Sequence, residues 1–172
     1  MFVKGLYMLL AQDAGVSAIA GSGIYFILQP KGTSVPSVVL SCVSTGDLYS
    51  MAGNTGLRDG LWQIDCYASD YYSSNALMLA VRDLLENYTG NLPDADATEI
   101  ISSIVEKSWD MPYEPGGKGF IFRSLLEVRF RYYDTSLPVS TPSNPVAIID
   151  GGTGDGNDTG VMTEAIVDGG TT

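Results

Sequence analysis

Residues 61–68 read LWQIDCYA and residues 77–88 read LMLAVRDLLENY, and together these two stretches decide the fold. In the first stretch apolar and polar residues alternate, which is the two-residue period of a strand with one buried face. In the second stretch apolar residues recur at positions i, i+3, i+4, i+7, i+8 and i+11, so they form a single stripe along a helix. A cap for the start of this helix is available at Asp70, Ser73 or Ser74. We therefore expect a half-buried strand followed directly by an amphipathic helix.

The periodicity elsewhere predicts one more helix, over residues 3–17, and four more strands. Three of these strands are expected at residues 24–28, 37–42 and 120–132. Residues 100–109 fit a helix or a strand, and their β-branched content favours a strand. The resulting order, α-β-β-β-α-β-β, predicts an α+β fold in which two helices flank a single mixed, mostly antiparallel sheet, with the helices on one side.

The composition excludes most catalytic and metal chemistry. The chain has 172 residues, no histidine and two cysteines, which removes histidine-based triads, HExxH zinc sites and four-cysteine zinc sites. Nine Lys and Arg against 20 Asp and Glu give a net charge of −11, whereas a nucleic-acid-binding protein needs a basic surface. Charged residues make up only 17% of the chain. That share is typical either of a surface covered by neighbouring subunits or of dilution by a glycine-rich tail.

No nucleophile, base or metal-ligand set stands out, so we expect no enzymatic activity, no cofactor and no metal site. No apolar stretch reaches the roughly 18 residues of a membrane helix. The apolar run over residues 5–11 is interrupted by Gln12 and Asp13, which argues against a cleaved signal peptide. The chain is therefore expected to be soluble and intracellular.

Three weak chemical signals have simpler interpretations. Residues 155–160 have the opening spacing of a calcium loop, but Ile166 stands where the bidentate Glu should be, which favours a polar turn. Asp65, Asp70 and Glu86 could form a carboxylate pair for acid–base chemistry, but scattered surface acids are favoured on so acidic a chain. The glycines of residues 115–119 lack the phosphate-loop spacing, which favours a hairpin turn.

The two cysteines, Cys42 and Cys66, lie on predicted apolar strand faces. A free cysteine in such a place behaves as a small buried hydrophobic residue. A disulfide between adjacent strands is the alternative, and a reducing cell disfavours it.

The composition changes near Leu137. All nine basic residues precede it, so residues 1–136 carry a net charge of −6 and residues 137–172 carry −5. The second part is rich in Pro, Gly and Thr, which favours an extended backbone. We therefore predict an α+β domain over residues 1–136 and an acidic C-terminal arm over residues 137–172.

The arm contains an internal repeat, AIIDGGT at residues 147–153 and AIVDGGT at residues 165–171. Each copy places β-branched residues before Asp-Gly, which is typical of a strand entering a turn. Two such strands are unstable alone in water but can add to the sheet edge of a neighbouring subunit. The alternative is a disordered tail with chance similarity. The apolar residues that would make this contact are Ile148, Ile149, Ile166 and Val167.

Two further groups are candidates for contacts with other subunits or with a tube. Residues 46–60 read as a long loop between strands, and such loops are usually functional or disordered. Its apolar residues Tyr49, Met51 and Leu57 have no evident core to enter. Arg123, Arg129 and Arg131 form a basic stripe on the last strand. These arginines could meet phosphate, a solvated face or acidic groups of a partner, and the acidic chain favours a protein partner.

The body of the chain resembles the tail completion proteins of long-tailed phages. The resemblance covers about residues 1–135 and consists of apolar periodicity and a few prolines, without a catalytic signature. It rests on Leu9-Leu10-x-x-Asp13-x-x-Val16-x-x-Ile19, Gly23-Ile24-Tyr25, Pro30, Pro36-Ser37-Val38-Val39-Leu40, residues 62–68, the helix from Ala76 to Leu85, and residues 120–133. The part beyond Leu137 departs from this pattern.

This resemblance implies a structural virion protein that ends the tail. Such proteins assemble as a ring, usually a hexamer, on the head-proximal end of the tail tube, stop its polymerisation and offer a surface to the head–tail connector. The implied partners are other copies of the chain, the major tail tube protein and the connector proteins, with no membrane. DNA would pass through the lumen without specific binding, and an acidic wall would suit that passage because like charges repel. A connector or stopper ring is the alternative. Either protein would be assembled in the host cytoplasm.

Overall fold

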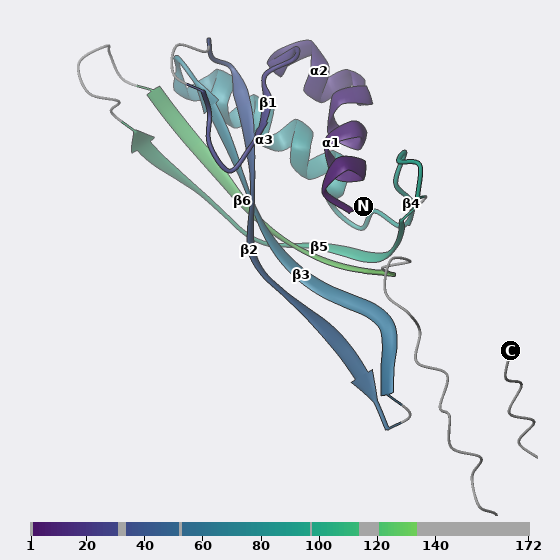
Figure 1. Ribbon diagram of the computed structural model, residues 1–172. Coiled ribbons are helices and arrows are strands. Elements are labelled where there is room, and N and C mark those ends of the chain that lie inside the picture. The colour runs from purple at the N-terminus through teal and green to yellow at the C-terminus, as the bar shows by residue number, and fades with distance from the viewer. Residues whose placement is uncertain (1, 31–33, 52, 97, 114–120, 134–172) are drawn as a thin grey trace, which may run out of the picture. The chain divides into compact units, whose positions relative to one another are not determined.

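The computed structural model describes residues 2–30, 34–51, 53–96, 98–113 and 121–133 (Figure 1). The helices are α1 (Phe2–Gln12), α2 (Ala14–Ala20) and α3 (Tyr71–Leu85). The strands are β1 (Ile24–Phe26), β2 (Ser37–Ser50), β3 (Gly53–Ala68), β4 (Gly90–Asn91), β5 (Glu99–Tyr113) and β6 (Ile121–Tyr133).

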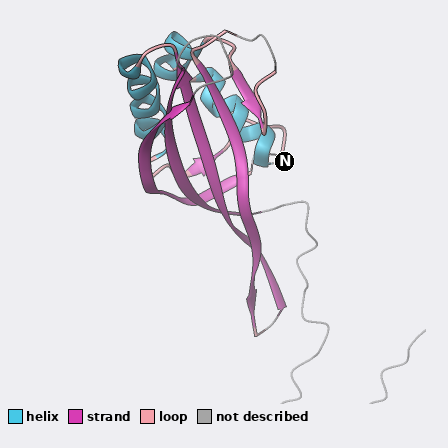
Figure 2. Ribbon diagram, turned by 90° about the vertical axis from the view of Figure 1, so that its left-hand side faces the viewer, coloured by secondary structure: helices cyan, strands magenta, loops and turns pink. Residues whose placement is uncertain are grey.

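The strands form one sheet in the order β1-β2-β3-β6-β5-β4. Strand β1 pairs with β2 in parallel, and every other pair is antiparallel. The three helices cover one face of the sheet, and within the described ranges no helix covers the other face, which we call the open face (Figure 2). The predicted α+β class with a single mixed, mostly antiparallel sheet is confirmed, with three helices in the described part where two were expected.

The extra helix arises at Asp13, where the single predicted helix over residues 3–17 is broken. The Asp13 carboxylate accepts a hydrogen bond from the Val16 backbone amide at 2.8 Å, which makes it the N-cap of α2. A cap residue has extended backbone angles, so the chain turns between α1 and α2 instead of continuing as one helix. At α3 the predicted cap is confirmed, because the Asp70 carboxylate accepts from the Ser73 amide at 2.9 Å.

Replacing Asp13 by alanine should therefore destabilise the protein by about 1 kcal/mol, the usual cost of losing a helix cap. Asp13→Asn should recover most of this loss because its side-chain oxygen can still accept the hydrogen bond. Urea unfolding followed by circular dichroism measures both variants. Equal stabilities for Asp13→Ala and Asp13→Asn would show that the cap contributes nothing.

The core lies between the sheet and the helices. On α3 the predicted stripe faces the sheet, with Leu77, Val81 and Leu85 fully buried. At the other end of the core the Phe2 ring of α1 stacks on Tyr132, with ring centroids 4.2 Å apart. It also meets Trp62 and Phe130, each at 5.3 Å. Burial of these aromatic and aliphatic side chains is the main force that holds the helices on the sheet.

The prediction of a long loop over residues 46–60 is wrong. Strands β2 and β3 run through it and pair from Ser37–Tyr67 to Ser50–Gly53. The loop was expected because glycines and a bulge at Val43 interrupt the alternation of apolar and polar residues. Among the described residues, β6 pairs with β3 from Leu57 onward, as far as Tyr133. Beyond that point the described part of the hairpin is a ribbon of strands β2 and β3 that projects away from the helices (Figures 1 and 2).

Candidate assembly surfaces

The end of the β2–β3 hairpin exposes apolar side chains, as the sequence predicted. Tyr49 is 72% exposed and Met51 is fully exposed, and Leu48 beside them is also exposed. Leu57 lies at the base of the ribbon, where it is half-buried and pairs with Tyr133. The hairpin tip, defined as Leu48, Tyr49 and Met51, is therefore an apolar surface without a core of its own.

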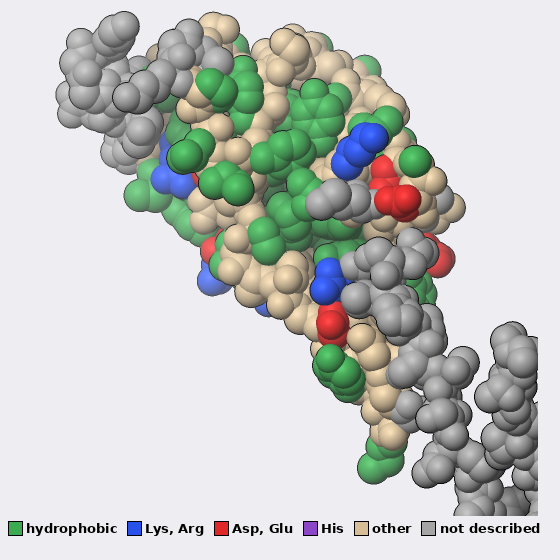
Figure 3. Space-filling model, viewed as in Figure 1, with side chains coloured by type: hydrophobic (Ala, Val, Ile, Leu, Met, Phe, Trp, Pro, Cys, Tyr) green, Lys and Arg blue, Asp and Glu red, His purple; other side chains and the backbone are tan. Residues whose placement is uncertain are grey.

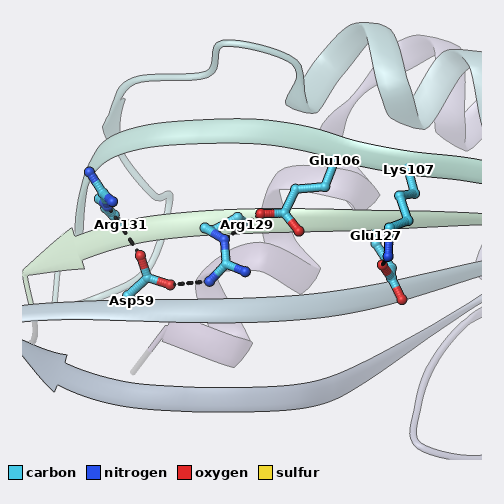
Figure 4. A network of polar contacts seen from close by, with 6 residues as sticks. All are labelled: Asp59, Glu106, Lys107, Glu127, Arg129 and Arg131. Atoms are coloured by element: carbon cyan, nitrogen blue, oxygen red, sulfur yellow. Dashed lines mark hydrogen bonds and ion pairs between the residues drawn. The ribbon is translucent and has the colours of Figure 1, made fainter.

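The basic stripe of β6 does not present free cations. On the open face of the sheet Arg129 lies between Asp59 of β3 and Glu106 of β5 and contacts both, with Nη1 at 2.5 Å from Asp59 (Figure 4). The Nε of Arg131 donates to the same Asp59 carboxylate at 3.1 Å. The strand register explains this, because Asp59 pairs with Arg131 across the ladder. The acidic partners that were expected from another protein are supplied by neighbouring strands of this chain.

This network sets the ionisation of Asp59. Partial burial acts to raise the pKa of the Asp59 carboxyl, but hydrogen bonds and charges from Arg129 and Arg131 outweigh it, so the pKa lies below its ordinary value of 3.8. Hydrogen bonds to Glu106 and then to Asp59 raise the pKa of Arg129, which stays charged at every accessible pH.

A carboxyl whose pKa is lower in the folded state stabilises the fold above its unfolded pKa, and this contribution is lost as the pH falls through the folded pKa. Asp59→Asn should therefore lower stability at neutral pH by up to about 1 kcal/mol, a size that suits solvent-screened pairs. The difference in unfolding free energy between this variant and the unmodified protein should shrink as the pH falls below 3.8. Urea unfolding at several pH values tests this, and a difference that grows in acid would contradict it.

Arg123 occupies a different environment from the other two arginines. Its Nη2 donates to Asp65 at 3.0 Å, and Asp65 is only 4% exposed. Gln63 donates a further hydrogen bond to this carboxylate from its Nε2 at 3.0 Å. Asp65 was expected to be a surface acid, and this is wrong, because Arg123 and Gln63 supply the donors that allow the carboxylate to be buried.

The three acids considered for acid–base chemistry have separate structural partners. Asp65 pairs with Arg123, Asp70 caps α3, and Glu86 pairs with Arg82 one helical turn away at 2.8 Å. The arrangement therefore offers no pair of carboxylates around a common substrate position. Among the described residues, no group of three or more Cys, Asp or Glu could hold a metal ion.

A cavity of about 180 Å³ lies beside the start of α3 and is lined by Tyr71, Asp110, Met111, Phe122, Arg123 and Ser124. Its polar groups hydrogen-bond to one another. The Asp110 carboxylate accepts from the Ser124 hydroxyl at 2.6 Å and from the Tyr71 hydroxyl at 3.2 Å. The negative charge of Asp110 raises the pKa of Tyr71. These contacts tie α3 to β5 and β6, and they make a structural cluster.

Both cysteines were predicted to be buried on apolar strand faces, and this is confirmed for Cys66 and wrong for Cys42. Both thiols are free; Cys66 is buried, whereas Cys42 is exposed. Cys42 pairs with Trp62 and Cys66 with Val38, so the two lie about 13 Å apart along the ladder at the rise of a strand. Burial, and secondarily the charge of Asp65, raises the pKa of the Cys66 thiol, and burial raises that of Cys42.

One thiol per chain should therefore react with a thiolate-directed reagent in the folded protein, and two should react after unfolding in urea. Absorbance with Ellman's reagent gives both counts. In a Cys42→Ser variant the folded protein should not react at all. Rapid reaction of that variant would mean that Cys66 is accessible.

A second exposed apolar surface was not predicted from the sequence. It consists of Phe26, the last residue of β1, of Ile27 and Leu28, which follow it, and of the half-buried Tyr7 of α1; we call it the α1–β1 surface. Ile27 is 74% exposed and Leu28 is 76% exposed. Figure 3 shows hydrophobic side chains over this region and again at the end of the hairpin. Residues 24–28 were predicted to form a short strand, but the strand ends at Phe26. Ile27 and Leu28 therefore lie outside it, and their apolar character did not indicate that they are exposed.

The remaining candidates lie outside the described residues. They are Ile148, Ile149, Ile166 and Val167 of the repeat, the calcium-like residues 155–160 and the glycine turn at residues 115–119. In the described part, no helix has the length and apolar character needed to cross a membrane.

Comparison with known proteins identifies the family. The family model described as tail completion protein gp17 matches residues 4–133. A solved structure described as the virion of a native gene transfer agent particle contains a chain with the same fold, with a TM-score of 0.61 and 19% identity. The match covers 75% of this chain and 92% of that one. A search among curated proteins finds no match. The chain therefore belongs to the tail completion protein gp17 family, and it has a structural role in a phage tail.

Proposed function

We propose that this chain forms a ring, with six copies, at the head-proximal end of the tail tube, where it stops tube polymerisation and joins the tail to the head connector. The observation that carries this proposal is the apolar hairpin tip on a chain of the tail completion family. Three large apolar side chains in water are costly unless a partner covers them. Their place on a projecting ribbon suits contact with a second molecule.

The two edges of the sheet support a ring in particular. Among the described pairs, β1 covers one edge of the sheet, at β2, as far as Leu40. At the other edge β4 covers the start of β5, at Glu99 and Ile100. The edges that remain in the described part are unlike in sequence and lie on opposite sides of the sheet. Contacts between unlike surfaces are head-to-tail, and they generate closed rings when the rotation between copies closes.

The charge of the chain suits a channel for DNA. The net charge is −11, and the described arginines of β6 are paired with carboxylates of the same chain. A wall of this kind offers no free basic stripe to phosphates, so DNA would pass without specific binding. The partners in this proposal are other copies of the chain, the major tail tube protein and the head–tail connector proteins. The protein would act in the virion after assembly in the host cytoplasm.

The proposal assigns separate tasks to the two parts of the chain. Residues 1–136 would build the ring, and residues 137–172 would act as an arm that clamps an adjacent subunit or the connector. The support for the arm is its repeat, with β-branched residues before Asp-Gly in both copies.

Electron microscopy of particles from a phage that lacks this gene tests the function. We expect overlong tail tubes beside unattached heads, because nothing would stop the tube. Tails of normal length that fail to join heads would instead assign the chain to the connector or stopper ring, which is the second candidate. Intact, infectious particles would contradict both. Restoring the gene on a plasmid is the control for effects on neighbouring genes.

A further inference from the structure

The α1–β1 surface is built to stay exposed until another molecule covers it. Apart from the exposed Lys4 and Gln12, helix α1 consists of apolar residues and Gly5. Its residues Val3, Tyr7 and Leu9 are only partly buried against the core. The Tyr7 ring lies 5.7 Å from that of Phe26, which continues the apolar surface from the helix to β1. The apolar stripe of an amphipathic helix normally faces the core. In α1 the core buries Leu6 and Leu10, and it leaves Val3 and Tyr7, which lie one helical turn apart, partly exposed.

The backbone at Ile27 holds this surface open. The Leu28 amide donates to the Phe26 carbonyl at 2.6 Å, which closes a three-residue turn around Ile27 with a φ of 64°. A β-branched residue with positive φ is strained, at a cost of about 1–3 kcal/mol. The Ile27 amide also donates to the Leu40 carbonyl at 2.9 Å, which fixes the turn to β2. The strain is maintained although the side chain gains no burial within the chain.

The hairpin tip is the complementary surface, because it is also apolar and also without a core. It cannot reach the α1–β1 surface of its own chain. Phe26 pairs with Leu40, and Tyr49 lies about 30 Å further along the same strand at the rise of 3.3 Å per residue. Pairing with β3 keeps the ribbon extended, so it cannot fold back.

We infer that the hairpin tip of one copy docks on the α1–β1 surface of the next copy. This contact rests on the proposed ring and names the surfaces that build it. A projecting element that meets a distant, unlike surface gives a head-to-tail contact, and repetition of that contact leads from copy to copy around a ring. Tyr49 and Met51 would supply the aromatic and thioether anchors that are enriched at the centre of interfaces.

Photo-crosslinking in assembled tails tests the contact. A photoreactive phenylalanine derivative at position 49 should yield multimers of this chain, with adducts mapped by mass spectrometry to Tyr7 or to residues 26–28. The matched control carries the derivative at position 72, because Tyr72 is at least as exposed as Tyr49 but lies at the start of α3. That control should give no such multimers.

Variants give a second readout. Tyr49→Ser and Leu28→Ser should each weaken assembly at least tenfold, and the double variant should lose less than the product of the two, because both changes remove the same contact. Tyr72→Ser should assemble normally. All these side chains are exposed, so urea unfolding should show unchanged stability.

The outcomes separate the contact from the ring. One outcome is that electron microscopy shows rings while the adducts from position 49 map to the tail tube protein or to another part of this chain. This result would contradict the proposed contact and leave the proposed ring standing. If the copies of the chain in assembled tails form no ring, both proposals fail.

Discussion

Replacing Arg123 by glutamine is expected to destabilise the fold by about 3 kcal/mol, because it leaves a buried carboxylate without its cation. Asp65 is 4% exposed and receives hydrogen bonds from Arg123 and Gln63. Removal of one partner of such a pair costs more than the pair itself contributes, since the remaining charge is desolvated and unpaired. Urea unfolding at neutral pH provides the measurement.

A double variant isolates the cause. In Asp65→Asn with Arg123→Gln no buried charge remains, so much of the lost stability should return. Arg129→Gln is the matched control, because Arg129 lies on the same strand as Arg123 but pairs with the more exposed acids Asp59 and Glu106. This substitution should lower the stability by no more than about 1 kcal/mol. If the double variant were as unstable as Arg123→Gln alone, the packing of the arginine stem would be responsible, and the argument from the unpaired charge would be wrong.

Phe130→Ala is expected to cost about 4 kcal/mol, the largest loss among these substitutions. Phe130 is fully buried near the end of β6, and its ring meets the Phe2 ring of α1 edge to face at 5.3 Å. The substitution removes a large apolar side chain and leaves a cavity under α1. We therefore expect a lower unfolding midpoint in urea and lower protection of the α1 amides from hydrogen exchange.

Phe130→Leu separates the cavity from the aromatic contact. Leucine fills most of the volume of the phenylalanine side chain. The loss of stability for Phe130→Leu should therefore be well under half of the loss for Phe130→Ala. Tyr133→Ala, three residues along the same strand at an exposed position, should have little effect on stability. A loss for Phe130→Ala below about 1 kcal/mol would show that α1 repacks to close the cavity.

The sequence predicted the elements that have a single buried face, because that face imposes a periodic pattern of apolar residues. Residues 61–68 alternate because Trp62, Ile64 and Cys66 all face the helices, and that alternation needs no tertiary information. The α3 stripe was predictable for the same reason. The break at Asp13 was not, because the apolar residues on both sides of it fit one continuous helix. Only the hydrogen bond from Val16 to the Asp13 carboxylate shows that a new helix begins there.

Part of the candidate surfaces was predictable from the type of residue and its neighbours in the sequence. Tyr49 and Met51 were identified because no core was evident for them, and they are exposed. The partners of Arg129 and Arg131 were not predictable, because Asp59 is far away in sequence and its position depends on the register of β3 against β6. The exposure of Ile27 was not predicted, because it follows from a strained turn with a positive φ at this residue. The apolar character of the residue gives no indication of such a turn.

The bulge at Val43, together with a second irregularity between Asp47 and Tyr49, determines where the hairpin tip points. A bulge adds twist and bend to a two-stranded ribbon, and Ser50 lies about 23 Å beyond Val43 at the rise of an extended strand. At that length, a rotation of about 20°, the usual twist between neighbouring strands, moves the tip sideways by about 8 Å. Deletion of Val43 would leave every cross-strand pair in place and still re-aim the tip. Over the course of evolution, a single inserted or deleted residue at this position would thus change the diameter of the proposed ring while the contacting side chains stay the same.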